Sequence, residues 1–491
     1  MGFWRHRIKV RIILIKEPDL FFGKNLKCLD PQVGLLNFGP HGGSSSEEAP
    51  KISIRTGIVG TQRSIDKTKV WLDRLKFRIH AEQRSKTEYK GIDFPGLRAD
   101  GPLRFEIAID DNCCAEIDRG FVRDLEALDR KERISVTLKQ YCRKFDDLKD
   151  AHPSPQILLL PLDDDILRLC KEPHQKTDKI VYQHREFGDP SSSLAEIFDF
   201  HNYLKAQASL RNFTTQLISP KTLMFSEEKQ SAALIAWNFS VALYYKATGV
   251  PWKLADIDDI TCYIGVSFYN EISHSGKNVR ASIAQVYLRR GESQVIRGEA
   301  FEWNEEMEKR NVRLTSQQME KIIRDSIVLF QRQRGILPKR VVVHKSSRFS
   351  DEEIAGCQKA CENIDSLDIV FVREFPGFRA YHDGFDYPVV RGTGIINTTE
   401  ALLFTSGYVP ALATYPGPSV PRPLHLICQR LDSSIETVCA DIMGLTKLDW
   451  NSSTFYTRMP VTIGVSRKVG EVMAEMVASQ GEPPNSYKFF M

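Results

Sequence analysis

The sequence predicts an α/β protein with more than one domain, and three observations support this fold class. The chain has 491 residues, enough for two to four domains of about 150 residues each. In both halves, short apolar segments of strand length alternate with longer segments of helical periodicity, as in parallel α/β sheets. Hydrophobic residues make up 42% and charged residues 26% of the chain, which excludes a disordered or fibrous protein.

The first half shows a strand–helix alternation after an irregular beginning. Residues 1–45 read as strands that Gly and Pro interrupt, and the polar loop at 44–48 is a plausible domain boundary. The pattern then predicts elements in this order: a strand at 52–61, a helix at 65–78, a strand at 103–109 and a continuous apolar strand at 155–161.

The second half continues the alternation with mixed strands. A helix over 228–248 ends before Gly249 and Pro251, which are typical helix-stop residues. The later elements are strands at 261–269, 341–344, 369–373 and 401–405, a hairpin over 281–302, and helices at 317–334 and 351–364. We place the boundary between the two halves near residue 255.

Charge and cysteine content restrict the function only weakly. There are 67 Lys and Arg against 63 Asp and Glu, so the net charge of +4 does not by itself indicate a nucleic-acid partner. The 10 cysteines are scattered, and Cys357 and Cys361 lack a second pair that would complete a zinc site, so we expect reduced thiols. No apolar segment reaches the roughly 20 residues of a membrane span, and no signal peptide is recognisable, so we expect a cytoplasmic protein.

Four polar residues form the one group in the first half that suggests a binding site. His201 and Lys205 are four residues apart and share a helical face, Gln216 follows two threonines expected in a turn, and Lys246 ends a long helix. Two amines, an imidazole and an amide that converge on a helix N-terminus would suit a terminal phosphate. The alternative is a solvated helix surface. Phosphate loops of the GxxxxGK[ST] type, HExxH and GxSxG are absent.

The order of several motifs resembles that of short prokaryotic Argonautes. The matching segments are 17–23, 30–40 and 54–61, the series His201, Lys205, Gln216 and Lys246, and then 264–266, 338–344, 391–393, 405–407 and 421–423. The resemblance implies a Rossmann-like MID domain over 46–255 and an RNase H-like PIWI domain over 256–491. It also implies that residues 1–45 pack on the PIWI sheet as strands and that the protein has no PAZ domain.

The same resemblance gives the four polar residues a role. In that family, residues matching His201, Lys205, Gln216 and Lys246 bind the 5′ phosphate of a guide strand. A Mg²⁺ ion often bridges the phosphate, the residue matching Gln216 and the C-terminal carboxylate, here that of Met491. The apolar tail before Met491 is expected to enter a core; a frayed tail is the alternative.

The PIWI half departs from the pattern of family members that cut nucleic acid. Active PIWI domains hold two metal ions with carboxylates, and serines stand where these are expected: Ser267, Ser346 and Ser466. Glu299 is the candidate for the one remaining acidic position. We therefore expect no catalysis. The competing hypothesis is a guide-directed endonuclease that uses Glu299 with Asp351 or Asp383.

For such an inactive protein the resemblance implies a sensor with partners. These are a guide RNA, a single-stranded DNA target and a separate effector with an Argonaute-associated (APAZ) region, acting in defence against plasmids or phage. The effector is expected to be of the NAD-degrading sirtuin or TIR type, with a nuclease as the less favoured alternative. A scaffold that merely holds the effector inactive is a further alternative.

Overall fold

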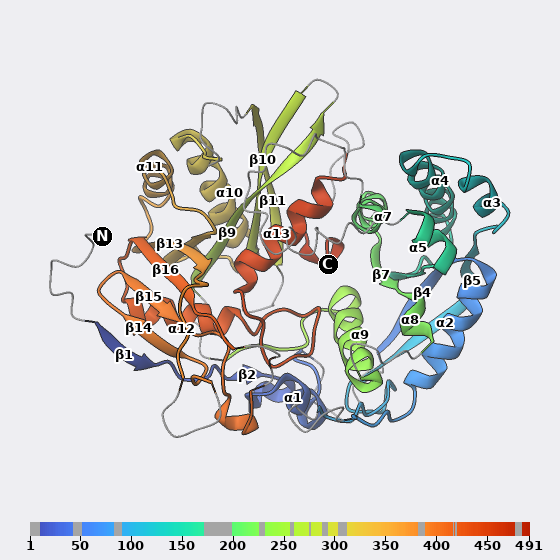
Figure 1. The fold of residues 1–491 in the computed structure, drawn as a ribbon, viewed down its shortest axis with the longest axis horizontal. Coiled ribbons are helices and arrows are strands. Elements are labelled where there is room, and N and C mark those ends of the chain that lie inside the picture. Colours follow the sequence, from blue (N-terminus) through green and yellow to red (C-terminus); the bar gives the residue numbers. More distant parts are fainter. Residues whose placement is uncertain are drawn as a thin grey trace.

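The computed structural model describes most of the chain and contains three β-sheets (Figure 1). The described residues are 10–42, 52–82, 91–170, 199–224, 231–255, 260–273, 276–286, 293–302, 312–381, 388–415, 417, 420–476 and 484–491. The expected loop at 44–48, the centre of the expected hairpin turn and Asp383 lie outside these residues.

The first half of the chain forms a four-stranded parallel sheet with helices on both faces. Its strand order is β5-β4-β6-β7, and every neighbouring pair is parallel. The strands are β4 (Ile52–Gly60), β5 (Phe105–Glu116), β6 (Ile157–Pro161) and β7 (Thr214–Ile218). The helices are α2 (Gln62–Leu75), α3 (Phe121–Leu125), α4 (Arg130–Lys149), α5 (Asp164–Cys170), α7 (Phe200–Ser209), α8 (Pro220–Leu223) and α9 (Ala232–Ala247).

Strand β6 explains the continuous apolar run in the sequence. All its residues are buried, because Ile157 and Leu159 face the core that contains Trp71 of α2, while Leu158 and Leu160 face the opposite core. A strand covered on both faces needs no alternation of polar and apolar residues. This half is therefore a doubly wound, Rossmann-like sheet, as the sequence predicts.

The second half is built on a nine-stranded mixed sheet with the order β1-β14-β15-β16-β13-β12-β9-β10-β11. Strands β9, β10 and β11 form an antiparallel meander, β12 runs parallel to β9, and β13 runs parallel to β12. This is the strand arrangement of RNase H. The five strands of the sheet that follow this arrangement are β9 (Thr261–Ser273), β10 (Gly276–Val286), β11 (Ser293–Glu302), β12 (Arg340–Lys345) and β13 (Ser366–Glu374).

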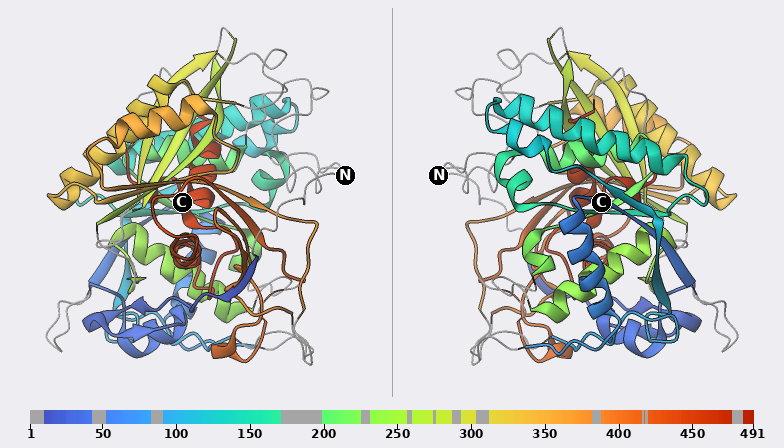
Figure 2. Two further views of the ribbon diagram at one scale, coloured as in Figure 1. Left: turned by 90° about the vertical axis from the view of Figure 1, so that its left-hand side faces the viewer. Right: turned by 90° about the vertical axis from the view of Figure 1, so that its right-hand side faces the viewer.

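Four helices cover this central sheet, two on each face (Figures 1 and 2). Helices α10 (Ser316–Arg334) and α11 (Asp351–Ala360) pack on one face, and α12 (Ile435–Leu445) and α13 (Val461–Met473) on the other. The remaining strands extend the sheet: β14 (Thr393–Ile396), β15 (Glu400–Leu403) and β16 (Leu424–Arg430).

The N-terminal segment is only partly as expected. β1 (Arg11–Leu14) pairs with β14 and extends the large sheet, whereas β2 (Leu20–Phe21) and β3 (Lys27–Cys28) form a small sheet with β8 (Lys253–Leu254). Residues Pro31–Phe38 form helix α1, so the expectation of strands throughout 1–45 is wrong here. Asp30 accepts hydrogen bonds from the backbone N–H groups of Gln32 and Val33, and Pro31 at the first helical position suits the helix.

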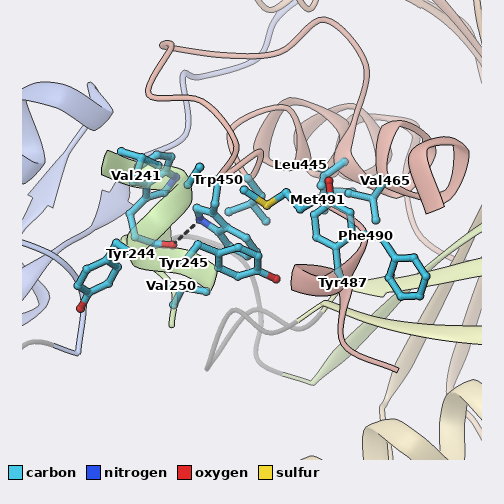
Figure 3. Packing of buried hydrophobic residues seen from close by; sticks show 14 of the residues in the cluster. Val241, Tyr244, Tyr245, Val250, Leu445, Trp450, Val465, Tyr487, Phe490 and Met491 are labelled. Atoms are coloured by element: carbon cyan, nitrogen blue, oxygen red, sulfur yellow. Dashed lines mark hydrogen bonds between the residues drawn. The ribbon is translucent and has the colours of Figure 1, made fainter. Parts of the chain in front are cut away.

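The two halves meet in a hydrophobic cluster around α9 (Figure 3). The ring of Tyr245 lies 4.9 Å from that of Trp450 and 6.4 Å from that of Tyr487, measured between ring centroids. Phe490 and Met491, at the end of the chain, are buried in the same cluster, with 1% and 3% of their surface exposed. The apolar tail therefore enters the core, and the frayed alternative is wrong.

Candidate nucleic-acid interface

His201 and Lys205 lie on helix α7, near the junction of the two halves. Both come from the expected helical face, one turn apart. The N-terminus of α7 is capped by Asp199, whose carboxylate accepts hydrogen bonds from the backbone N–H groups of His201 and Asn202. Because this carboxylate already takes two of the free N–H groups at the helix N-terminus, an anion held here must be bound mainly by side chains.

Gln216 and Lys246 are in direct contact. The Nζ atom of Lys246 donates to the Oε1 atom of Gln216 at 2.7 Å and to the backbone oxygen of Thr215 at 2.9 Å. Gln216 lies on strand β7, not in a turn, because Thr214 and Thr215 pair with β6. The structure thus joins residues of β7 and α9, and β7 in turn packs against α7.

Neither lysine of this site forms an ion pair with an acidic side chain in the described residues. Lys246 has only 2% of its surface exposed, and in the described ranges no carboxylate is within ion-pairing distance of Lys246 or Lys205. Burial, followed by the charges of Lys205 and Lys468, lowers the pKa of Lys246 well below its usual value. Burial and Lys468 lower the pKa of Lys205 to about 8, against the opposing effect of Asp199 and Glu471. A buried amine without a counter-ion is costly, so this site favours an anion.

His201 responds to the same charges. The surrounding protein, and then Lys205 and Lys246, lower the pKa of His201 well below its usual value, although the residue keeps surface open to solvent. A neutral imidazole offers one N–H donor and one acceptor. His201 therefore suits a hydrogen bond to an anion at the open side of the site. We call His201, Lys205, Gln216 and Lys246 the anion pocket.

Sequence reasoning missed Lys468, which lies on α13 in the other half of the chain. Its charge acts on both lysines of the anion pocket, and its Nζ atom lies 3.6 Å from Asp449 Oδ2. Nothing in the spacing of the sequence connects it with Lys205 or Lys246. Only the packing of α13 against α7 brings these residues near one another.

The C-terminal tail reaches the same neighbourhood. The short helix η4 (Tyr487–Phe489) contacts both β7 and α9, the elements that carry Gln216 and Lys246. Gln216 Oε1 keeps a second lone pair beside the one that accepts from Lys246. Mg²⁺ takes oxygen donors of this type, and Gln216 offers one of them. In the described part of the chain, no three His, Cys, Asp or Glu side chains are grouped to hold a metal.

Two of the three positions expected to carry catalytic carboxylates, Ser267 and Ser346, lie close together. Val266 of β9 pairs with Lys345 of β12 in parallel register, so Ser267 and Ser346 follow at the same level of neighbouring strands. Ser466 is instead buried in α13, where its hydroxyl lies within hydrogen-bonding distance of the backbone oxygens of Thr462, in the same helix, and of Gly265, at 3.2 Å. It acts there in helix–strand packing.

The described residues place no other candidate acid beside Ser267 and Ser346. Glu299 belongs to strand β11, but its side chain lies outside the described part. Asp351 is exposed in the first turn of α11. Beside Ser346, the buried Lys345 pairs with Glu353 at 2.5 Å, and Glu353 also accepts from the backbone N–H of Ser350, so this acid is engaged in structure.

Two arginines lie near the Ser346 end of the sheet. The guanidinium carbons of Arg348 and Arg373 lie 6.0 and 5.6 Å from the ring centroid of Phe371, which pairs with Lys345 in the sheet. Both arginines are exposed, and no carboxylate pairs with them in the described segments. Exposed arginines over an aromatic ring can contact a nucleic-acid backbone.

The likeness to solved structures agrees with this layout. The Argonaute of Clostridium butyricum, solved with a guide DNA and a 19-mer target DNA, superposes with a TM-score of 0.64 at 15% identity, over 95% of this chain and 54% of that one. The fold is that of the Argonautes. A. aeolicus Argonaute gives a TM-score of 0.55 at 14% identity over 98% of this chain and 55% of that one. Aa-Ago with externally bound siRNA gives 0.55 at 16% identity, over 99% and 56%.

The Argonaute likeness identifies the two halves as MID-like and PIWI-like. This chain spans about half the length of those Argonautes. No protein-family model matches the sequence, and no curated protein matches it. No helix in the described residues is both long and apolar enough to cross a membrane. All ten cysteines are free thiols.

Proposed function

We propose that the chain binds the 5′ phosphate of a guide strand in the anion pocket and uses that guide to recognise a complementary single strand. The observation that carries this proposal is the pair of lysines, Lys205 and Lys246, without a carboxylate partner in the described residues of an Argonaute fold. A phosphate monoester brings up to two negative charges and several acceptor oxygens, which match these donors. The structure of the Clostridium butyricum Argonaute with guide and target DNA supports this role for the fold.

The proposed guide is RNA and the proposed target is single-stranded DNA, as the short-Argonaute resemblance implies. Mg²⁺ would be held by Gln216 and the C-terminal carboxylate of Met491, and would neutralise part of the phosphate charge when bound. Lys205 and Lys246 supply charge, and His201 supplies a hydrogen bond. EDTA should therefore weaken binding of a 5′-phosphorylated guide more than binding of a 5′-hydroxyl guide.

The test compares guides that differ only at the 5′ end. Replacing Lys205 and Lys246 by alanine removes charge-assisted hydrogen bonds worth roughly 1.5–3 kcal/mol each, so binding of the phosphorylated guide should weaken more than tenfold. The dissociation constants of 5′-phosphate and 5′-hydroxyl guides, as RNA and as DNA, measure the effect. Lys359→Ala on α11 is a matched control, because it removes the charge of an exposed lysine in the other half. Equal losses for both guides would refute the pocket assignment.

We further propose that pairing between guide and target acts as a signal, and that this chain does not cut the target. Serines at 267, 346 and 466 provide no anionic ligands for two metal ions, so chemistry would fall to a partner. The proposed partner is an effector with an APAZ region, of sirtuin or TIR type and NAD-consuming, in a cytoplasmic defence against plasmids or phage. Pairing of guide and target can change the activity of the effector only if the paired and unpaired states of this protein bind the effector with different affinity.

Co-expression with the product of the neighbouring gene tests this partnership. We expect a stable complex whose NAD consumption rises with a matched target and not with a scrambled one. A complex that carries no short nucleic acid would favour the scaffold alternative. Guide-dependent cleavage at one phosphodiester would favour the endonuclease alternative.

A further inference from the structure

We propose that residues 10–19 form a releasable arm that covers the edge of strand β14, and that the carboxylate of Glu17 is the latch that holds the arm in place. The arm contains β1, the strand at one end of the nine-stranded sheet (Figure 1). Its release would expose the edge of β14 while the rest of the fold stays intact. This inference goes beyond the proposed guide binding and does not depend on it.

The first support is that β1 buries little apolar surface. Ile12 and Leu14 expose 76% and 64% of their surface, and Val10 before them exposes 50%. Ile13 and Ile15, on the other side, pack against the core, and both keep part of their surface open to solvent. Among the described strands, β1 pairs with β14 alone. A short edge strand of this kind opens locally at a small cost in free energy, so its position depends on other contacts of the arm.

The second support is a buried ion cluster at the end of the arm. Glu17 Oε2 accepts from Nε of Arg391 at 2.9 Å, and Glu17 Oε1 accepts from Nζ of Lys447 at 3.1 Å. The side chains of both cations are fully buried, and in the described residues Glu17 is the carboxylate that pairs with each of them. Two buried cations without this carboxylate would be costly, so Glu17 draws the arm onto the protein.

The third support is that the two cations are fixed to the body of the protein without the arm. Arg391 Nη2 donates to Thr446 Oγ1 at 2.8 Å, and the backbone oxygen of Lys447 accepts from Trp252 Nε1 at 2.8 Å. The Nζ atom of Lys447 also donates to the backbone oxygen of Leu29 at 2.6 Å. The receiving site is therefore built by other segments, and the arm contributes one carboxylate to it.

Hydrogen–deuterium exchange of the full chain tests the latch. Glu17→Gln leaves both cations without a counter-ion, so the amides of residues 11–15 that donate to the sheet should exchange faster by about tenfold or more. The amides of β14 that pair with β1 should follow them. Exchange in β6 and β12, in the cores of the two halves, should stay unchanged.

Asp19→Asn is the matched control for this variant. It removes a carboxylate from the same arm, but one that pairs with Lys16, whose side chain is 79% exposed. An exposed ion pair contributes little to stability. Exchange of residues 11–15 should therefore remain as in the wild type.

A double variant separates the charge of Glu17 from its shape. Adding Lys447→Met to Glu17→Gln removes one of the two cations that lack a counter-ion, so it should restore part of the protection that Glu17→Gln loses. A further loss of protection in the double variant would mean that the ion pair is not what holds the arm.

The wild type gives a readout that needs no variant to fold. Its arm amides should exchange by local opening, at a rate that low urea concentrations hardly change, whereas exchange in β6 should accelerate with urea. If the arm accelerates in parallel with β6, it opens only when the whole protein unfolds and the proposal is overturned. Unchanged exchange of the arm in Glu17→Gln, or faster exchange throughout that variant, would overturn it as well.

Discussion

His344 shows how a single buried residue can make the stability depend on pH. It is fully buried, its Nδ1 atom lies 2.9 Å from Thr462 Oγ1, and its Nε2 atom has no hydrogen-bond partner in the described structure. Burial, and then the charge of Arg340, lower the pKa of His344 to about 3. The folded state therefore binds fewer protons than the unfolded state, whose histidine pKa is about 6.5.

We predict that His344 contributes stability above pH 6.5 that is lost as the pH falls toward 3. The loss from this residue should approach about 1.4 kcal/mol per pH unit below pH 6.5. Urea unfolding at pH 7.5, 6.5 and 5.5 measures the free energy of unfolding, which should decrease less with falling pH for His344→Leu than for the wild type. His152→Leu, at an exposed histidine, should keep the wild-type dependence of this free energy on pH. Identical slopes in all three proteins would mean that His344 does not titrate as argued.

Arg348 and Arg373 are expected to contact the backbone of a bound nucleic acid. Because each phosphate contact releases counterions, the double variant Arg348→Ala, Arg373→Ala should reduce the slope of log K against log salt by about one to two. Target affinity of the guide-loaded protein, measured at several salt concentrations, tests this. A control that replaces Arg332 and Lys359, exposed on α10 and α11, changes the net charge equally. An equal change of slope in the control would mean that only net charge matters.

At the scale of elements, α13 is the helix that contacts the PIWI-like sheet, carries Ser466 and packs against the MID-like half. It approaches β9 so closely that a Cβ atom at Gly265 would lie 1.9 Å from the backbone oxygen of Thr462. Ser466 and Thr462 fill the space along β9, and Glu475 beyond the helix end holds α7. A displacement of α13 would therefore disturb both halves.

We predict opposite effects for two glycine substitutions at this contact. Gly265→Ala should destabilise the protein by about 2–3 kcal/mol or more, because backbone atoms cannot yield to the new methyl group. Gly464→Ala, inside α13 with no heavy atom near its Cβ position, should stabilise by about 0.5–1 kcal/mol. Guanidinium unfolding measures both. Similar stabilities for the two variants would show that the helix is not packed as closely as described.

At the scale of the whole molecule, the two halves carry different candidate sites. The MID-like half carries the anion pocket, and the PIWI-like half offers Ser267 within β9 and Ser346 directly after the end of the parallel strand β12. With guide, complementary target and Mg²⁺ or Mn²⁺, we expect no cleavage, since hydroxyl groups do not replace anionic metal ligands.

The cleavage assay needs its own control. An Argonaute that cleaves its target, assayed under the same conditions, shows that the guide and target can support cleavage. Glu299→Gln should change nothing in this chain. A product at one fixed phosphodiester that disappears in Glu299→Gln would establish the endonuclease alternative.

The sequence by itself determined the elements whose signal is local. Hydrophobic runs and helix-stop residues predicted β6, the β10–β11 hairpin and α9 to within a few residues of their observed bounds. The order of these elements led to the two α/β halves, and the spacing of His201 and Lys205 led to a shared face of α7. Helix α1 was missed because the N-cap Asp30 and Pro31 lie in a short, mostly apolar segment without helical periodicity.

Only the tertiary structure decided what depends on contacts between distant segments. The pairing of β1 with β14, the approach of Lys468 to the pocket and the two arginines around Phe371 join residues that no sequence period relates. The capping of α7 by Asp199, which leaves anion binding to side chains, also required coordinates. Periodicity records which side of an element is buried; it does not record which other element covers that side, because many partners bury the same area equally well.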